Sequence, residues 1–474
     1  MSRIFRNTLY YSLGEIIPRI LSFILLPVLT TYLTTFEYGI NSYTTTVMTF
    51  LYVVGSLSLN TFVLKTYHIT TDEISRKQLI WSVFIFICVF NIVISILQLL
   101  IFPGLLSFFN INIPFKPFFT ISIINNFFDV IAIIPLVLYR VKEDAKSFLI
   151  LSLSRTILQF IAVYIFVVIL EKGLEGSYYA RLLVNIPFLL IYFQIISKNS
   201  VMKIDFVLLK SAIRFSLPLL PGSLAYLFVS LSDRLLLERY IGLEELGIYS
   251  VAATLVLVLN IVIQAFYKTF EPILFKEFLS SDFQETNLKF YKVYLIILFI
   301  AAFATAIFSK EFFQIFTSSA FNLAYKIVPF LTLSVVIFGI NTYLNVLMIA
   351  NNKQKIVSMV SIISAFISIL FNLLFIPIYG LFGAVIASTM SFLFTNVVYH
   401  YHVTIRSRYI MSQILLLFGL VVISYYFNLI FAFDSIVENF FVKILILIVF
   451  ALATLFFFQI RPRDIIKYFV GSYI

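Results

Sequence analysis

Fourteen long apolar stretches constrain the fold of this chain more than any other feature of its sequence. Each is long enough to cross the hydrocarbon core of a bilayer as a helix, which takes about 20 predominantly apolar residues. Such runs exceed the roughly 9–11 residues of a membrane-spanning β-strand and lack its alternation. The sequence therefore predicts an all-α polytopic membrane protein with about 14 transmembrane helices. The predicted spans lie near residues 8–33, 40–64, 79–102, 117–139, 147–170, 175–197, 213–237, 246–267, 290–309, 325–350, 356–377, 381–403, 411–432 and 440–459.

The composition supports this class and excludes others. Hydrophobic residues make up 62% of the chain and charged residues only 12%, whereas a soluble domain has roughly 25% charged residues. The net charge is +11, but the basic residues are scattered through short loops, which favours positive cytoplasmic loops over a nucleic-acid partner. Cys88 is the only cysteine, so no intramolecular disulfide is possible. Glu15, Pro18 and Arg19 interrupt the first apolar stretch, which argues against a cleavable signal peptide.

The distribution of Lys and Arg predicts the orientation of the chain. The N-terminus, the even-numbered loops and the C-terminal tail hold 23 of the 33 basic residues. The odd-numbered loops hold six, and four more lie within spans. Because basic residues accumulate on the cytoplasmic side of a membrane, both termini are predicted to be cytoplasmic. The six in odd-numbered loops are Lys116, Lys172, Arg239, Lys310, Lys326 and Lys443.

Two short internal matches indicate a duplication. Residues 36–40 (FEYGI) match 244–248 (EELGI) at a shift of 208, and residues 173–176 (GLEG) match 380–383 (GLFG) at a shift of 207. Each half then holds six spans, an even number, so both copies enter the membrane from the same side. We expect two six-helix lobes, 1–198 and 205–404, related by a pseudo-two-fold axis along the membrane normal. Residues 405–474 are expected to add two further transmembrane helices and a cytoplasmic tail.

Seven ionisable residues fall within predicted spans. Facing lipid, each costs roughly 2.5–3.5 kcal/mol. Seven together cost about 20 kcal/mol, more than the roughly 5–15 kcal/mol that holds a typical domain folded. They are therefore predicted to face protein or a water-filled cavity. These residues are Glu15, Arg19, Asp129, Arg155, Arg181, Asp233 and Arg234.

Some of these charges could be satisfied ion pairs that fix helix packing. Glu15 and Arg19 stand at i and i+4 on one helix, where they can pair. Asp129 could neutralise Arg155 from a neighbouring span. For both pairs, fixing the packing of helices is therefore the alternative to a direct role in the function of the protein.

The remaining three charges favour a functional interpretation. Asp233 and Arg234 are adjacent and point about a quarter-turn apart, so they are predicted to pair poorly with each other and to have partners elsewhere. Arg181 has no acidic residue one turn away on its own helix. Because a guanidinium donates two parallel hydrogen bonds to a phosphate, Arg181 is the strongest candidate for contact with an anionic cargo.

The loops hold no catalytic constellation. The longest connections, near 198–212 and 268–289, contain no combination of nucleophile, histidine and acid. His400 and His402 stand at i and i+2, which points their rings to different faces of a helix and argues against a metal site. The sequence predicts a transporter and not an enzyme, with no cofactor.

Three segments carry a resemblance to a known family. They read GEIIPRILSFILLPVLTTYLTTFEYGINSY (14–43), SLPLLPGSL (216–224) and SDRLLLERYIGLEELGIYSVA (232–252). Pro218 and Pro221 in the second segment are predicted to bend a spanning helix, since each removes a backbone donor. Over nearly its whole length the chain resembles the Wzx-type polysaccharide-biosynthesis flippases of the multidrug/oligosaccharidyl-lipid/polysaccharide superfamily.

This resemblance implies a function. It implies a flippase in the bacterial cytoplasmic (inner) membrane that moves a glycan on undecaprenyl pyrophosphate to the outer leaflet by alternating access, in O-antigen or capsule biosynthesis. The pathway's polymerase and chain-length regulator, besides the membrane lipids, are the implied partners, and a proton or sodium gradient is the implied energy source. With this cargo, Arg181, Arg234, Arg155 and Arg19 are predicted to bind the pyrophosphate, and Asp129, Asp233 and Glu15 to couple an ion.

Three alternatives remain at this stage. A lipid II flippase differs only in the headgroup of its cargo. A cation-coupled drug or metabolite exporter favours an acidic cavity, whereas here arginines outnumber acids within spans by four to three. A membrane-embedded glycan polymerase or acyltransferase usually has a large external loop, whereas the odd-numbered loops here are short.

Overall fold

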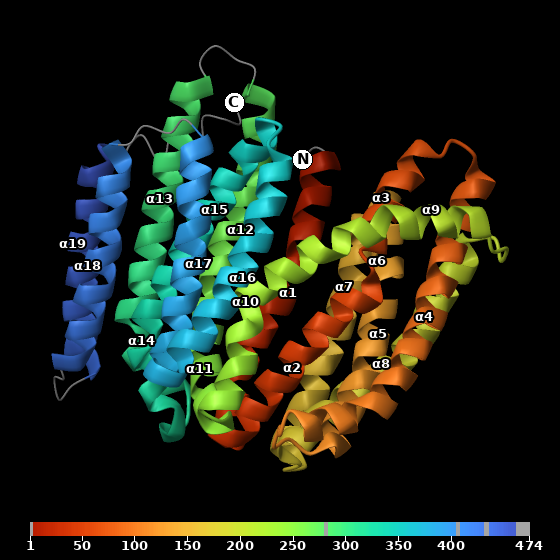
Figure 1. Ribbon diagram of the computed structural model, residues 1–474, viewed down its shortest axis with the longest axis horizontal. Helices are drawn as coiled ribbons and strands as arrows, with labels where there is room; N and C mark the ends of the chain where they lie inside the picture. The colour runs from red at the N-terminus through yellow and green to blue at the C-terminus, as the bar shows by residue number, and fades with distance from the viewer. Residues whose placement is uncertain (1–2, 279–282, 404–407, 431–435, 461–474) are drawn as a thin grey trace. The chain divides into compact units, whose positions relative to one another are not determined.

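The computed structural model describes residues 3–278, 283–403, 408–430 and 436–460, and all regular secondary structure in them is helical (Figure 1). Fourteen segments of this part are long and apolar enough to cross a membrane. Each overlaps one of the stretches predicted above, from Leu9–Tyr32 to Glu438–Phe458. The predicted all-α polytopic membrane protein with about 14 spans is therefore confirmed.

The helices follow one another with short connections. The first nine are α1 (Arg3–Tyr32), α2 (Thr35–Ser56), α3 (Leu59–Ile69), α4 (Glu73–Phe108), α5 (Thr120–Ile131), α6 (Ile133–Val141), α7 (Ala145–Tyr164), α8 (Gly173–Asn199) and α9 (Phe206–Ser216). Then come α10 (Leu220–Tyr240), α11 (Leu243–Val256), α12 (Val258–Glu277), α13 (Phe283–Ile307), α14 (Ser309–Phe316), α15 (Val328–Ala350), α16 (Gln354–Tyr379), α17 (Leu381–His402), α18 (Arg408–Ile430) and α19 (Ile436–Phe458). Short 3-10 or π turns occupy Phe115–Phe119, Ile165–Ile169, Leu217–Leu219 and Ser319–Lys326.

Several spans contain more than one helix, and in two of them the break has an evident local cause. α2 and α3 are separated at Leu57 and Ser58, whose φ angles of 47° and 54° are left-handed and cannot continue a right-handed helix. The span of α9 and α10 contains the 3-10 turn at Leu217–Leu219, with Pro218 in the turn and Pro221 at the start of α10. The interruption predicted from these prolines is therefore present.

The chain forms two compact units. Unit 1 comprises Met1–Leu227 and Gly242–Gly247, and unit 2 comprises Phe228–Ile241 and Ile248–Ile474. Both α10 and α11 therefore run through the boundary. The internal repeat predicts a different division, into lobes 1–198 and 205–404 with 405–474 added. That division follows duplicated segments, whereas the two units follow compactness, so the lobes stay a prediction.

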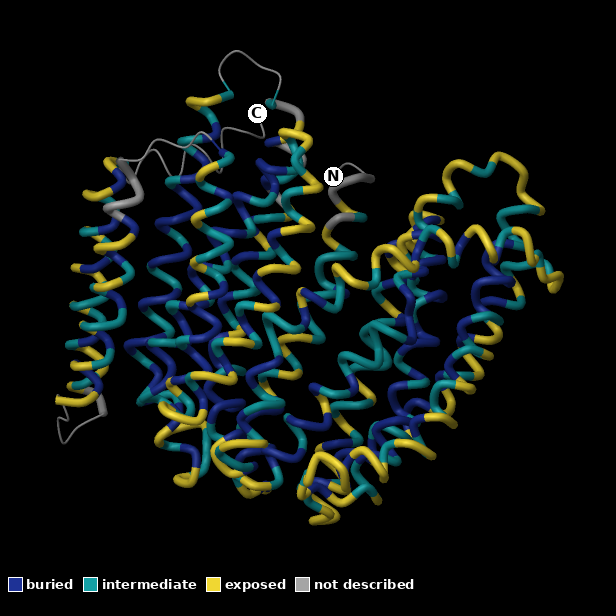
Figure 2. The backbone as a smooth tube through the Cα atoms, viewed as in Figure 1, coloured by how far each residue is buried: buried dark blue, intermediate teal, exposed yellow. Residues whose placement is uncertain are grey.

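Unit 1 has an apolar core between α3, α4, α5, α6, α8 and α9. Leu79, Val83 and Ile87 of α4 are fully buried, and so are Ile131 and Ile134 at the junction of α5 and α6. The three α4 residues recur at i, i+4 and i+8, so they form one stripe along the helix. Away from this stripe, α4 carries exposed apolar side chains, among them those of Ile96 and Leu100. Figure 2 shows exposed residues along this helix. Exposed apolar side chains are expected where lipid and not water covers the surface.

The duplicated glycines make a reciprocal contact within unit 1. A Cβ atom on Gly39 would lie 1.9 Å from the carbonyl oxygen of Leu243, and one on Gly247 would lie 2.0 Å from the carbonyl oxygen of Thr35. Thr35 and Leu243 are themselves equivalent at the shift of 208. The first turns of α2 and α11 therefore cross so closely that only hydrogen fits at either glycine.

We expect Gly39→Ala and Gly247→Ala each to lower the stability of the protein. The added methyl group overlaps a backbone carbonyl that cannot turn aside as a flexible side chain could, and overpacking of this kind costs about 1–3 kcal/mol. The thermal unfolding midpoint of the purified protein in detergent measures the effect. Gly104→Ala in α4 is the matched control, because nothing lies within 4 Å of its added Cβ. Equal midpoints for all three variants would contradict the close contact.

Unit 2 holds its last two helices through a buried ion pair. Nζ of Lys443 in α19 lies 2.7 Å from Oε2 of Glu311 in α14, and the two side chains are only 1% and 6% exposed. The ammonium group also donates to the carbonyl of Ile307 at 2.8 Å and to Oδ1 of Asn428 in α18 at 2.6 Å. The predicted place of Lys443 in an external loop is therefore wrong. It lies inside α19, where three acceptors satisfy its ammonium group.

Candidate functional site

A polar cavity of about 520 Å³ lies among the helices of unit 1. Six helices line it, namely α1, α2, α5, α6, α7 and α8. Its lining is unusual for spanning helices because hydroxyl, amide and charged side chains face inward together. The polar members are Ser22, Thr45, Thr49, Tyr52, Ser122, Asn125, Asn126, Asp129, Arg155, Thr156, Gln159, Tyr178, Arg181 and Asn185.

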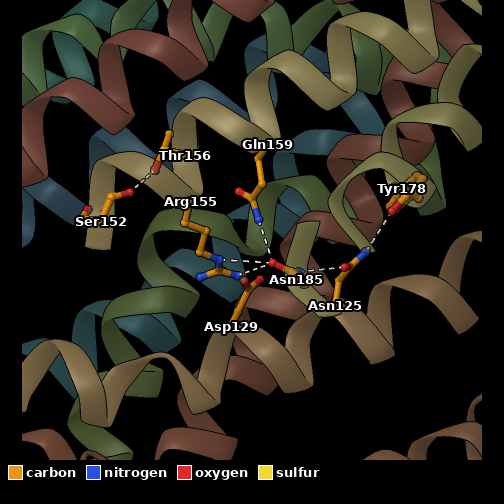
Figure 3. A network of polar contacts seen from close by, with 8 residues as sticks. All are labelled: Asn125, Asp129, Ser152, Arg155, Thr156, Gln159, Tyr178 and Asn185. Atoms are coloured by element: carbon orange, nitrogen blue, oxygen red, sulfur yellow. Dashed lines mark hydrogen bonds and ion pairs between the residues drawn. The ribbon is translucent and has the colours of Figure 1, made fainter. Parts of the chain in front are cut away.

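An ion pair stands at the wall of this cavity (Figure 3). Arg155 of α7 donates from Nη2 to Oδ1 of Asp129 in α5. The Arg155 side chain is only 16% exposed, whereas that of Asp129 is 47% exposed toward the cavity that both residues line. The predicted neutralisation of Arg155 by Asp129 is confirmed. Asp129 nevertheless keeps half of its surface available to whatever enters the cavity.

Asn185 of α8 is the centre of the polar network around that pair. Its Oδ1 accepts from Arg155 Nη2 at 2.9 Å, from Arg155 Nε at 3.2 Å and from Gln159 Nε2 at 2.9 Å. Its Nδ2 donates to Asn125 Oδ1 at 2.9 Å, and Asn125 in turn donates to the Tyr178 carbonyl at 3.2 Å (Figure 3). This arrangement fixes the guanidinium plane of Arg155, because two of its nitrogens bond one oxygen.

Arg181 also lines the cavity, one turn before Asn185 on α8. It is half-buried, and in the described residues its guanidinium has no hydrogen-bond or ion-pair partner. Cavity water must therefore solvate this charge, since lipid cannot. Of the two arginines that line the cavity, Arg155 is held by Asp129 and Asn185, whereas Arg181 has no such partner among the described residues.

The two charges of α1 do not line this cavity. Glu15 forms an ion pair with Arg140 of α6, with Oε1 at 2.8 Å from Nη2, in place of the expected pair with Arg19 on the same helix. The Arg19 side chain is exposed. Of the five predicted site residues in unit 1, the cavity brings together Asp129, Arg155 and Arg181.

Asp233 and Arg234 belong to unit 2 and have contacts of their own. Asp233 is 5% exposed and accepts a hydrogen bond from the Tyr249 hydroxyl of α11, besides the Arg234 backbone N–H at 2.8 Å. Nη1 of Arg234 lies 3.6 Å from Asp233 Oδ1 and donates to the Ser230 carbonyl at 3.3 Å. The expectation that the two charges avoid each other is thus only half right. The two charges are within ion-pair distance, but the second carboxylate oxygen of Asp233 accepts its hydrogen bond from Tyr249.

The sequence analysis did not anticipate the contacts of two polar residues, Asn185 and Lys443. Asn185 carries no charge and was not among the predicted site residues, although three donors meet on its oxygen. Lys443 was counted with the loops, although the run FFVKILILIVF places it among apolar residues of a span. A charge inside such a run is the signal that should have paired it with a buried acid. Among the described residues, no group of three or more His, Cys, Asp or Glu is placed to hold a metal ion.

The fold is that of multi-span membrane transporters. The chain is similar in structure to the lipid II flippase MurJ in an inward closed conformation, with a TM-score of 0.75, 15% identity, and coverage of 95% of this chain and 98% of that one. It is also similar to an inward-facing multidrug resistance MATE family transporter of the MOP superfamily, with a TM-score of 0.64, 14% identity, and coverage of 83% and 98%. At these identities the likeness concerns the fold.

The sequence itself identifies the family. A family model described as polysaccharide biosynthesis protein matches residues 4–278, more than half of the chain. The chain belongs to this polysaccharide biosynthesis family. A comparison with curated protein sequences gave no significant match.

Proposed function

We propose that this protein is a flippase that moves an oligosaccharide repeat unit, linked to undecaprenyl pyrophosphate, across the bacterial cytoplasmic membrane for surface polysaccharide (O-antigen or capsule) biosynthesis. The observation that carries this proposal is the unpaired guanidinium of Arg181 in a polar cavity among spanning helices. Membership of a polysaccharide biosynthesis family supports the choice of a glycan cargo. The termini are proposed to be cytoplasmic, because the basic residues gather on that side.

The physical task explains why such a cavity is needed. An anionic and strongly hydrated headgroup cannot enter hydrocarbon without a cost of several kcal/mol per polar group. A cavity lined by hydroxyls, amides and guanidinium groups replaces that hydration, while the lipid tail stays in the bilayer. Alternating access then exposes the cavity first to the inner and then to the outer leaflet. Polysaccharide polymerase and chain-length regulator are the proposed partners on the product side.

The seven intramembrane charges differ in their suitability for these roles. Arg181 is the proposed primary ligand of the pyrophosphate, because its donors are uncommitted. Arg155 is the second, since it lines the same cavity. Arg234 and Arg19 remain proposed contacts that lie outside the described lining of this cavity. For coupling to a proton or sodium gradient, the proposed carboxylates are Asp129, Asp233 and Glu15.

Deletion of the gene tests the function directly. In a strain without a paralogue, the lipid-linked repeat unit is expected to accumulate on the cytoplasmic face, and mass analysis of that intermediate identifies the glycan. A plasmid copy of the chain should restore surface polysaccharide. Normal surface polysaccharide in the deletion strain would refute the proposal.

A lipid II flippase is the second candidate. The specific observation in its favour is the fold likeness to a lipid II flippase over 95% of this chain. A strain depleted of its own lipid II flippase separates the two, because only a protein with that cargo restores its growth. If the protein were instead a drug exporter or a membrane-embedded glycan polymerase, its deletion would leave the transfer of both lipid II and the repeat-unit intermediate across the membrane intact.

We expect Asp129→Asn to impair transport more than Asp129→Glu. A carboxylate can alternate between a charged and a neutral form, whereas the amide of asparagine cannot. Glutamate keeps that ability although it moves the group by one methylene. Transport is measured as restoration of surface polysaccharide in the deletion strain, at matched protein levels. Equal activity of the two variants would remove Asp129 from the set of titrating residues.

A further inference from the structure

The arrangement in the cavity points to an exchange of partners by Arg155. We propose that Arg155 pairs with Asp129 when the cavity is empty and with the pyrophosphate of the cargo when it is loaded, so that binding of the cargo leaves Asp129 to take up a proton. This inference rests on the proposed function. It concerns how the same cavity balances its charge.

The geometry brings the exchanging groups together. Arg181 stands one turn before Asn185 on α8, so their side chains are neighbours with about 5–6 Å between Cβ atoms. Asn185 in turn bonds two nitrogens of Arg155. Both arginines line the cavity, so a bridging pyrophosphate can take one guanidinium for each phosphate.

The present bonds leave room for this exchange. Arg155 bonds Asn185 through both Nε and Nη2, whereas it bonds Asp129 through Nη2 alone. Asp129 is held through Oδ1 and is half exposed to the cavity. A phosphate that approaches from the cavity can thus engage Arg155 without displacing the Asn185 amide that orients it.

Charge balance decides what happens to Asp129. The empty cavity holds two guanidinium groups and one carboxylate. A pyrophosphate diester brings a negative charge on each phosphate, which the two guanidinium groups can match. The carboxylate is then the unmatched charge of the cavity, and uptake of one proton restores the balance. A proton from the aqueous phase that faces the cavity binds Asp129, and it leaves again when Arg155 returns to Asp129 and the cargo departs.

Among the described residues that line the cavity, Asp129 is the only aspartate or glutamate. Tyr52 of α2 and Tyr192 of α8 are the neighbouring titratable groups that interact with the pair, and Arg140 contributes a more distant positive charge. Arg140 is itself paired with Glu15. Because the proton travels with the cargo, this exchange balances charge and promotes release. Under this exchange Asp129 leaves the set of coupling carboxylates proposed above, and a driving ion gradient would act through Asp233 or Glu15.

Binding of a defined ligand to the purified full-length protein tests the proposal. The ligand is a short-chain prenyl-pyrophosphoryl-N-acetylglucosamine, a pyrophosphate diester whose phosphates do not titrate near neutral pH. Its affinity for the wild type is expected to rise as the pH falls, with proton uptake on binding detectable in weakly buffered solution. Asp129→Asn, which removes the competitor for Arg155, is expected to bind about tenfold more tightly, within the range typical of coupled sites. Its affinity should not depend on pH.

Two further variants complete the design. Arg155→Gln is expected to bind more weakly and without proton uptake, and its thermal midpoint in detergent shows whether it is folded. Glu175→Gln, which removes an exposed acid of α8 outside the cavity lining, should behave as the wild type. Binding by the wild type without proton uptake, or unchanged affinity in Asp129→Asn, would overturn the exchange alone. No binding by the wild type would instead overturn the proposed function.

Discussion

Arg181→Lys is expected to lower repeat-unit transport by about 10- to 100-fold while the protein still folds and inserts. Lysine keeps the positive charge but presents a compact ammonium group, so the two parallel hydrogen bonds of a guanidinium to a phosphate are lost. Hydrogen bonds to charged groups contribute about 1.5–3 kcal/mol each, and each 1.4 kcal/mol corresponds to a factor of about ten. The measurement is the rate of repeat-unit externalisation in the deletion strain complemented at equal protein level.

The matched control for this prediction is Arg214→Lys. Arg214 is an exposed arginine in the last turn of α9, in the same unit and outside the cavity lining. It should tolerate lysine without loss of transport. Full transport in Arg181→Lys would assign Arg181 to packing and leave the cavity without its proposed anion ligand.

Lys443→Met is expected to destabilise the attachment of α18 and α19 by about 3–5 kcal/mol, because it leaves Glu311 buried without a counter-charge. The Ile307 carbonyl and the Asn428 amide oxygen lose a donor at the same time. The double variant Lys443→Met/Glu311→Met should recover most of the loss, since replacing a buried ion pair as a whole is often neutral. Thermal unfolding of the wild type, both single variants and the double variant forms a double-mutant cycle.

Glu285→Gln provides the comparison for a pair of the same type at the surface. Glu285 and Lys289 form an ion pair in α13, but their side chains are 71% and 43% exposed. Removing this pair is expected to change stability by less than about 1 kcal/mol. Similar effects of Glu285→Gln and Lys443→Met would mean that burial does not set the strength of the Lys443 pair.

Sequence reasoning performed differently for elements and for contacts. The fourteen spans were predictable because each depends on a local property, namely an apolar run as long as the bilayer is thick. The break at Pro218 and Pro221 was predictable for the same reason, since proline acts on its own helix. The pairing of Asp129 with Arg155 was predictable because only seven ionisable residues lie within the predicted spans. Partners such as Tyr249 for Asp233 were missed because a neutral hydroxyl carries no comparable signal.

By itself, the sequence determined that this chain is a helical membrane protein with charges that cannot face lipid. Tertiary structure alone decided which charges meet, because their partners lie on other helices. Glu15 is 125 residues from Arg140, and Lys443 is 132 residues from Glu311. Periodicity along one helix identifies its polar face, but the helix that this face meets depends on packing between distant parts of the chain. For that reason the cavity with its unpaired Arg181 became visible only in the folded unit.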